Sequence, residues 1–363
     1  MARKRKPDWI LFVATLGLVL VGSIMVFSSS AVIANDAFGD ANHFSFRHLV
    51  AVGLGLAGLF TLMRIDYGHY RHPGVVFSLL SVVVVLLMVA YLLPTTANTH
   101  RWIRLAGLSF QPGELAKLGM VVFMAYFLEK RSGLVNDVRF TLIPVSVITG
   151  LVCGLILMQP DLGTAVAIAA VVGVLLFVAG LNLRWVGVAA VLAAPAFYFL
   201  VYQVPWRRQR IFAFLDPWAD PLDSGFQIIQ SLTSVGSGGV TGVGLMEGQQ
   251  KLFYLPEPHT DFIFAVIGEE LGLMGTLFVL SLFAVFIWRG IRTAYLAPDL
   301  LGCYLALGLT MVVAIQAFFN MSVVLGLLPT KGIPLPFLSY GGSSFLVMLA
   351  AVGMLMNVSQ RGN

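Results

Sequence analysis

Long apolar runs, separated by shorter polar segments, dominate the pattern of this chain. Several runs reach the roughly 20 residues that cross a bilayer as a helix, and none shows the ten-residue alternation typical of a membrane-barrel strand. The pattern therefore predicts an all-α, polytopic membrane protein with ten transmembrane helices. Their expected positions are about 9–29, 46–63, 75–93, 113–129, 140–158, 162–180, 185–204, 262–288, 300–325 and 343–358.

The composition agrees with a membrane protein and excludes two other classes. Of the 363 residues, 58% are hydrophobic and 11% are charged, whereas soluble domains have about 45–50% apolar and about 25% charged residues. A soluble globular or disordered protein is therefore excluded, and we expect one membrane domain over 1–363. Cys153 and Cys303 lie within apolar runs, which indicates small core residues rather than a disulfide or metal site.

The distribution of lysine and arginine predicts the orientation in the membrane. Of the 22 such residues, thirteen fall on the side of the N-terminus and nine on the other side. The tail is basic throughout 3–6, and the short connections on its side carry most of the others, so both termini are expected in the cytoplasm. On the opposite side the cations gather mainly in three long loops, at about 94–112, 205–261 and 326–342.

The segment 205–261, between the seventh and eighth predicted helices, is expected to be a large extracytoplasmic loop of the membrane domain. It exceeds ordinary connection lengths and is rich in aromatic residues and glycine, so disorder is not expected and the working face is external. Its run 236–242 fits neither the dinucleotide nor the P-loop pattern. We therefore expect no nucleotide or nucleic acid partner, and an activated substrate or ion gradient must drive any chemistry.

Polar residues at the outer ends of the helices are the candidates for function, because charged groups at membrane depth are energetically costly. Pro112 and Glu114 suit the start of a helix, and Glu114 shares a helix face with Lys117. This pair is either a capped helix start with a local ion pair or part of a polar cavity. Asp161 is expected to be a first-turn carboxylate on the dipole of the following helix.

The run His259-Thr260-Asp261, between prolines and a wholly apolar helix start, is a stronger candidate. Capping of the eighth helix by Thr260 or Asp261 is the simpler interpretation, but capping does not require three polar residues in a row. Glu269 and Glu270, deeper in the same helix, are expected to be structural.

Two further features concern the ninth and tenth helices. The segment 327–344 is rich in proline and glycine, which is typical of a re-entrant or interface-lying loop whose backbone is covered by protein or water. Gln316 and Asn320, four residues apart on the ninth helix, are expected to hydrogen-bond across helices rather than to catalyse.

In these motifs the sequence resembles the SEDS family (shape, elongation, division and sporulation), the ten-helix peptidoglycan polymerases of bacteria. The resemblance covers nearly the whole chain and is most specific in the run Tyr-Leu-Pro-Glu-Pro-His-Thr-Asp-Phe at 254–262. Glu257-Pro258 and the run 329–332 look more like the division branch of the family than its elongation branch.

The resemblance implies glycosyl transfer between lipid II molecules at the outer face of the bacterial cytoplasmic membrane, for septal wall synthesis in cell division. One inverting displacement would form the new β-1,4 link and release undecaprenyl pyrophosphate. This reaction needs a base near the acceptor hydroxyl and a positive charge or metal on the departing pyrophosphate. No ligand spacing identifies a metal site, so a divalent cation such as Mg²⁺ stays an open alternative.

The resemblance also implies roles for single residues. Asp261 matches the family's essential aspartate and is the expected general base. Lys117 and Glu114 match a polar pair of the family, expected either to orient Asp261 or to contact phosphate. The candidate substrate contacts are polar residues of the external loops and helix ends, namely Arg101, Arg104, Arg207, Arg208, Arg210, Lys251, His259, Thr260, Ser339 and Ser343.

The expected partners are a class B penicillin-binding protein, which is a transpeptidase that cross-links the new strand, other division proteins and membrane lipid. Two other functions stay open on the residues alone: a flippase or transporter for the same lipid, and a non-catalytic scaffold that recruits a partner. Transporter sites usually lie near the bilayer midplane, whereas the polar residues of this chain gather near the outer face.

Overall fold

The computed structural model of the chain describes residues 6–93, 100–105 and 108–362. The predicted basic tail and the external loop at 94–112 therefore lie partly outside the described residues. The helices are α1 (Trp9–Phe38), α2 (His43–Arg64), η1 (Tyr67–Arg71), α3 (Pro73–Leu92), α4 (Pro112–Lys130), η2 (Val138–Leu142), α5 (Ile143–Met158), α6 (Leu162–Val178), α7 (Leu183–Phe197), η3 (Tyr198–Tyr202), α8 (Pro205–Leu215), η4 (Pro217–Ala219), α9 (Phe226–Ser237), α10 (Ile263–Tyr295), α11 (Leu300–Val324) and α12 (Gly342–Ser359).

The predicted all-α membrane architecture is confirmed. Within the part of the chain that the structure describes, eight helical stretches are long and apolar enough to cross a membrane. The other two predicted spans correspond to α4, which carries Glu114, Lys117 and Glu129, and to α6, which is apolar but only 17 residues long. The count of ten spans therefore stays a prediction.

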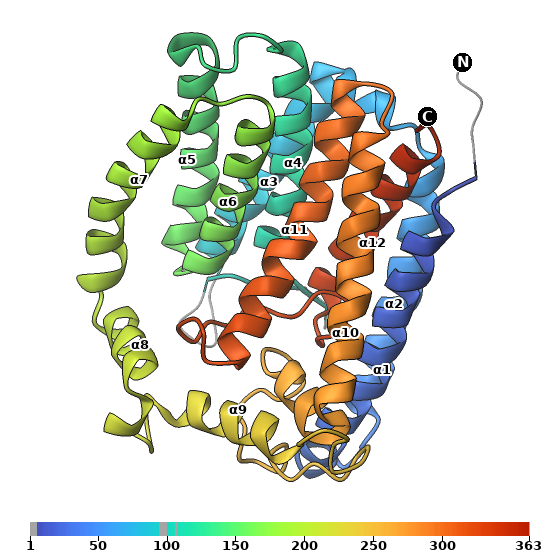
Figure 1. Cartoon of the computed structure of the whole chain (residues 1–363), viewed down its shortest axis with the longest axis vertical. Helices are drawn as coiled ribbons and strands as arrows, with labels where there is room; N and C mark the ends of the chain where they lie inside the picture. Colours follow the sequence, from blue (N-terminus) through green and yellow to red (C-terminus); the bar gives the residue numbers. More distant parts are fainter. Residues whose placement is uncertain (1–5, 94–99, 106–107, 363) are drawn as a thin grey trace.

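The helix α11 lies at the centre of the bundle, where it packs against α4, α6, α10 and α12. In its most apolar stretch 72% of the residues are buried within the protein, compared with 6% in the stretch formed by α7 and η3. Figure 1 shows α7 at the edge of the molecule, joined through α8 to α9. The helix α11 is thus the buried element against which the external segments are positioned.

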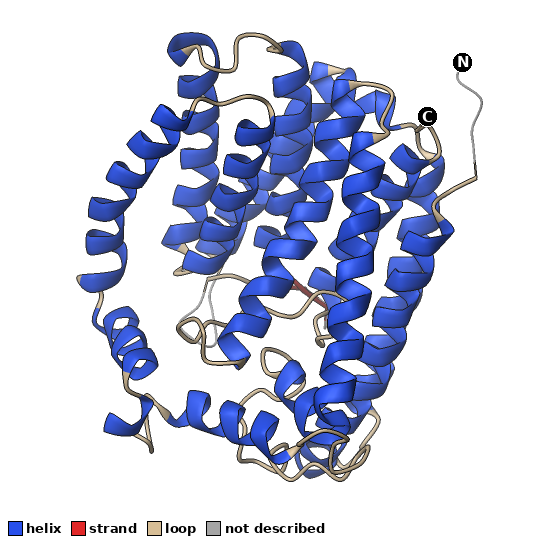
Figure 2. Ribbon diagram, in the orientation of Figure 1, coloured by secondary structure: helices blue, strands red, loops and turns tan. Residues whose placement is uncertain are grey.

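Short elements that the hydropathy pattern did not predict lie in the external loops. The strands β1 (Ile103–Leu105) and β2 (Leu108–Phe110) pair antiparallel, with Ile103 opposite Phe110. The segment 205–261 contains α8, η4 and α9, followed by turns up to the start of α10. Figure 2 shows how much of the molecule is helical and how small the hairpin is.

The long helix α10 is broken near its external end at Gly272, whose φ of 64° and ψ of −160° strain any residue except glycine. Backbone groups of the loop 239–244 hydrogen-bond to helix residues on both sides of the break, at N–O distances of 2.9–3.1 Å. The loop thus supplies partners for backbone groups that the break leaves unpaired. The short helix 263–271 before the break begins directly after Asp261.

Replacing this glycine tests the break. We expect Gly272→Ala to lower the thermal unfolding midpoint of the purified protein by several degrees, because a Cβ there would lie 2.3 Å from the amide nitrogen of Gly242. The backbone strain adds about 1–3 kcal/mol. Gly150→Ala is the matched control, because a Cβ at this position in α5 meets nothing within 4 Å. Equal midpoints for the two variants would contradict the proposed strain.

Candidate active site

A cavity of about 390 Å³ opens beside the start of α10. Segments far apart in the sequence form its wall: the turn before β1, the start of α6, the helices α8 and α9, the loop before α10 and the loop after α11. The residues that line it are Arg101, Pro160, Trp206, Arg210, Gln227, Glu257, Asp261, Phe262, Lys331 and Gly332. The structure therefore brings together three of the predicted site residues, Asp261, Arg101 and Arg210.

Asp261 lines this cavity, and a side chain of α11 holds its backbone. The side-chain amide of Asn320 donates to the carbonyl oxygens of Asp261 and Ile333, both at 2.7 Å. A Cβ at Gly332 would lie 2.7 Å from Oδ2 of Asp261, so only glycine permits this close approach. The hydrogen bonds predicted for Asn320 of α11 therefore go to loop carbonyls. They position the carboxylate of Asp261.

The surroundings of Asp261 make its carboxylate a usable base at neutral pH. Burial raises the pKa of Asp261 to about 7, and the negative charge of Glu257 acts in the same direction. The positive charges of Arg101 and Arg210 act in the opposite direction. A general base works best when its pKa lies near the operating pH, and this carboxylate meets that condition.

Three cations face the same cavity. Arg101 donates to the carbonyl oxygens of Gln159 and Pro160, and Arg210 donates to that of Thr330 at 3.3 Å. These bonds use part of each guanidinium, which has five N–H donors, and the remaining donors are available to an anion.

The third cation, Lys331, was not among the predicted site residues. It was one of the nine positive charges predicted on the outer side. Its side chain crosses the start of α6, where a Cβ at Gly163 would lie 2.3 Å from its Cε. Burial lowers the pKa of Lys331 to about 8, and the nearby Asp161 opposes this shift. Lys331 has no hydrogen bond or ion pair to any residue that the structure describes. Asp161 itself caps α6, as predicted, by accepting from Thr164.

Lys117 and Glu114 lie behind the cavity and do not line it. Lys117 donates to Glu114 at 2.8 Å and to Gln316, and Glu114 accepts from Ser344 at 2.9 Å. Gln316 in turn donates to the carbonyl of Pro334. This arrangement fits the local ion pair and connects Lys117, through Gln316, to the loop that carries Lys331. A role of this pair in orienting Asp261 or in contacting phosphate stays a prediction.

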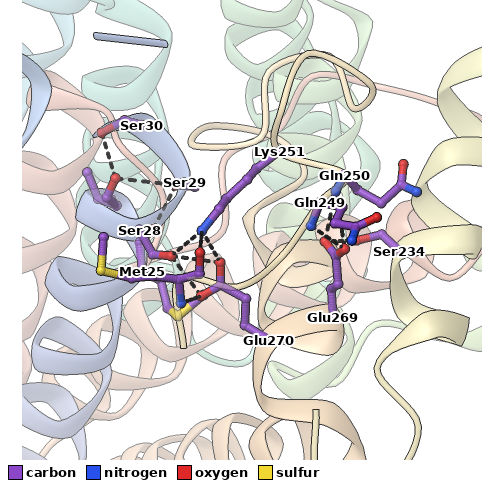
Figure 3. A network of polar contacts seen from close by, with 12 residues as sticks. Met25, Ser28, Ser29, Ser30, Ser234, Gln249, Gln250, Lys251, Glu269 and Glu270 are labelled. Atoms are coloured by element: carbon purple, nitrogen blue, oxygen red, sulfur yellow. Dashed lines mark hydrogen bonds and ion pairs between the residues drawn. The ribbon is translucent and has the colours of Figure 1, made fainter. Parts of the chain in front are cut away.

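Lys251, predicted as a phosphate contact, belongs to a different cluster. It is 3% exposed, pairs with Glu270 at 2.6 Å and donates to Ser28 at 3.0 Å. Figure 3 shows this ion pair beside Glu269, which accepts from backbone N–H groups of the same loop. Both glutamates therefore hold the loop 246–251 against α10, which fits their predicted structural role.

The remaining predicted contacts surround the cavity but do not line it. Arg207 donates to the carbonyl of Leu200, and Arg208 lies over the ring of Tyr202. The other positions support the wall. Arg104 lies in β1, and the ring of His259 packs against those of Phe44 and Tyr340. The remaining three form hydrogen bonds with loop residues: Thr260 with Glu257, Ser339 with Leu335 and Thr260, and Ser343 with Gln111.

Sequence reasoning missed seven of the ten lining residues, and four of these carry polar side-chain groups: Trp206, Gln227, Glu257 and Lys331. Lys331 carried the clearest signal, because it is a lysine between Thr330 and Gly332 in a loop expected to lie close to the membrane. No group of three or more histidine, cysteine, aspartate or glutamate side chains gathers within the described ranges. Participation of a divalent cation such as Mg²⁺ stays a prediction that this finding does not test.

The buried ion pair can be tested by its stability. We expect Lys251→Met to lower the free energy of unfolding by about 3–5 kcal/mol, because Glu270 would stay buried without its cation. The double variant Lys251→Met/Glu270→Leu should recover much of the loss, since it removes both charges. Thermal unfolding in detergent measures both, with Lys130→Met at an exposed position as control. A single variant as stable as the control would show that the pair contributes little.

Comparisons with known proteins were made over the whole chain. The family model of FtsW, RodA and SpoVE, described as "Cell cycle protein", matches residues 8–363. A relative from Geobacter metallireducens, named "Probable peptidoglycan glycosyltransferase FtsW", is 44% identical over 355 residues, covering 98% of this chain and 95% of the relative. "Stage V sporulation protein E" of Bacillus subtilis is 44% identical over 362 residues, covering 99% and 98%.

Two solved structures resemble the model closely. One is described as "Structural coordination of polymerization and crosslinking by a peptidoglycan synthase complex"; it has a TM-score of 0.80 and 32% identity, and covers 97% of both chains. The other is the rod shape determining protein RodA of Thermus thermophilus, with a TM-score of 0.71 and 27% identity, covering 97% of this chain and 96% of that one.

Proposed function

The chain belongs to the FtsW, RodA and SpoVE family, and we propose that it is a peptidoglycan glycosyltransferase that polymerises lipid II for the division septum. The observation that supports this most directly is the cavity that Asp261 lines together with three cations, Arg101, Arg210 and Lys331. One base and a set of positive charges are what an inverting transfer to a pyrophosphate-activated sugar requires.

The proposed reaction is a single displacement. The 4-hydroxyl oxygen of the acceptor sugar attacks the anomeric carbon of the donor, and Asp261 takes the hydroxyl proton. The new carbon–oxygen bond forms as the bond to the pyrophosphate oxygen breaks, and the electron pair leaves with undecaprenyl pyrophosphate. Arg101, Arg210 and Lys331 stabilise the negative charge that the leaving group gains.

The same cations prepare the leaving group without protonating it. Arginine presents a planar fork that matches phosphate oxygens, and the lysine adds a compact charge at the start of α6. The polyprenyl tail stays in lipid, so the cavity has to lie at the edge of the membrane. The position of Asp261 directly before α10, at the end of the bundle, meets this requirement.

A lipid II flippase is the second candidate, and the location of the cavity argues against it. Transporter sites usually lie near the midplane of the membrane, whereas the lining residues come from loops and helix ends. In the proposed assembly a class B penicillin-binding protein joins this chain at the outer face of the cytoplasmic membrane, which accords with the description of the similar synthase complex.

Replacing the base tests the function. We expect Asp261→Asn to lower the rate of glycan formation from lipid II about 100- to 10,000-fold, because the amide cannot accept the proton. The assay uses the purified chain with its cognate transpeptidase in detergent, and the glycan products are separated on a gel. Asp223→Asn, at an exposed position of the same external loop, is the control and should retain full activity.

Undiminished polymer from a folded Asp261→Asn protein would end the proposed mechanism. Loss of lipid II movement across vesicles with polymerisation intact would instead favour the flippase. If Asp261→Asn still supports septation in a depletion strain, the chain is a scaffold.

The acidic limb of the activity profile gives a second test. Asp261 acts only when deprotonated, so kcat/KM is expected to rise as the pH increases through about 7. Glu257→Gln removes a negative charge that raises the pKa of Asp261, so the midpoint should move to lower pH. Glu247→Gln, at an exposed site, should leave the midpoint in place. A midpoint that is unchanged or moves upward in Glu257→Gln would exclude Asp261 as the titrating base.

A further inference from the structure

A second cavity, of about 340 Å³, opens at the other end of α10 from Asp261. It lies where the start of α1 meets the ends of α10 and α12, close to both chain ends (Figure 1). The side chains that matter to its chemistry are Lys6, Asp8, Trp9, Arg289, Arg292 and Ser359. None of these residues lines the cavity that is proposed for glycosyl transfer.

An ion pair and hydrogen bonds between α1, α10 and α12 fix the wall of this second cavity. Arg289 of α10 pairs with Asp8, the N-cap of α1, at 2.6 Å. The backbone N–H of Asp8 donates to Ser359 of α12 at 3.2 Å. The other carboxylate oxygen of Asp8 accepts from the first backbone N–H groups of α1 at 3.1 Å. Asp8 therefore has no oxygen left over for a further cation.

The cavity consequently carries an excess of two positive charges. Asp8 is the one carboxylate among its lining residues, and Arg289 neutralises it. Within the described ranges, the side chains of Lys6 and Arg292 make no hydrogen bond or ion pair. Arg292 sits in the last turn of α10, where a cation is favourable because it offsets the helix dipole. The dipole of α10 does not explain Lys6, which belongs to the segment before α1.

Aromatic and apolar side chains place the cavity at the level of lipid headgroups. Trp9 is 58% exposed and Trp288 is 57% exposed, and Trp288 shares a helix face with Arg292 four residues later. Tryptophan is enriched at the boundary between membrane and water. Just beyond Trp9, Ile10 and Val13 are also exposed, so an apolar surface continues from the cavity along α1 towards the membrane interior.

From this combination we infer that the cavity binds the phosphodiester headgroup of an anionic phospholipid, such as phosphatidylglycerol or cardiolipin. Lys6 and Arg292 contact the phosphate oxygens, and the acyl chains lie along the exposed face of α1. Basic pockets between membrane helices are a known arrangement for such headgroups. A zwitterionic lipid has the same phosphate, but its own cation would meet two unpaired positive charges.

Native mass spectrometry of the full chain in a neutral detergent tests this site. The protein is titrated separately with phosphatidylglycerol, phosphatidylcholine and inorganic phosphate, and the retained adducts are counted. We expect phosphatidylglycerol to be retained preferentially, and Lys6→Gln and Arg292→Gln each to lower that retention about fivefold, which is the usual contribution of one cation near anionic lipid.

Arg184→Gln is the matched control for a general loss of charge. Arg184 is exposed beside Trp185, 5.8 Å from its ring centre, and Figure 1 shows the start of α7 at the same end of the bundle as both termini. This variant should retain phosphatidylglycerol like the unmodified chain. Equal retention of the two lipids, or an equal loss in Arg184→Gln, would overturn the proposal. Inorganic phosphate that displaces the lipid at equal concentration would identify a site for free phosphate instead.

Discussion

One side-chain amide, that of Asn320, joins the two external segments on which the candidate active site depends. Its nitrogen donates to the carbonyl of Asp261 and to that of Ile333, so both hydrogens are used. Because Asn320 belongs to the largely buried central helix α11, these bonds fix two irregular loops to a rigid support. This amide therefore sets the distance between Asp261 in one loop and Lys331 in the other.

The polar groups inside the bundle continue the same support. A lysine at the depth of Lys117 is tolerated because Glu114 and Gln316 accept from two of its three N–H groups. Gln316 extends the chain of hydrogen bonds to Pro334. Lys117 and Glu114, which the sequence offered as candidate catalytic residues, thus help to support irregular backbone. Such backbone is allowed near lipid only where protein covers it.

The membrane helices could be predicted from the sequence, because apolar runs are local signals. The motif at 254–262 is also local, and it is the reason that Asp261 is proposed as the base. The grouping of the cations could not. Lys251 and Lys331 both lie in long loops, and their spacing does not indicate that one pairs with Glu270 while the other lines the cavity of Asp261. Such convergence depends on the break at Gly272 and on loop packing, which hydropathy does not encode.

Two requirements conflict in the cavity, and the structure reconciles them. Binding pyrophosphate needs cations, but the positive charges of Arg101 and Arg210 lower the pKa of a nearby carboxylate and weaken it as a base. Burial and the charge of Glu257 oppose that effect at Asp261, so its pKa stands at about 7 rather than below its usual value. Glu257, an acid that makes no ion pair in the described part of the chain, therefore lets the proposed anion site and the proposed base share one cavity.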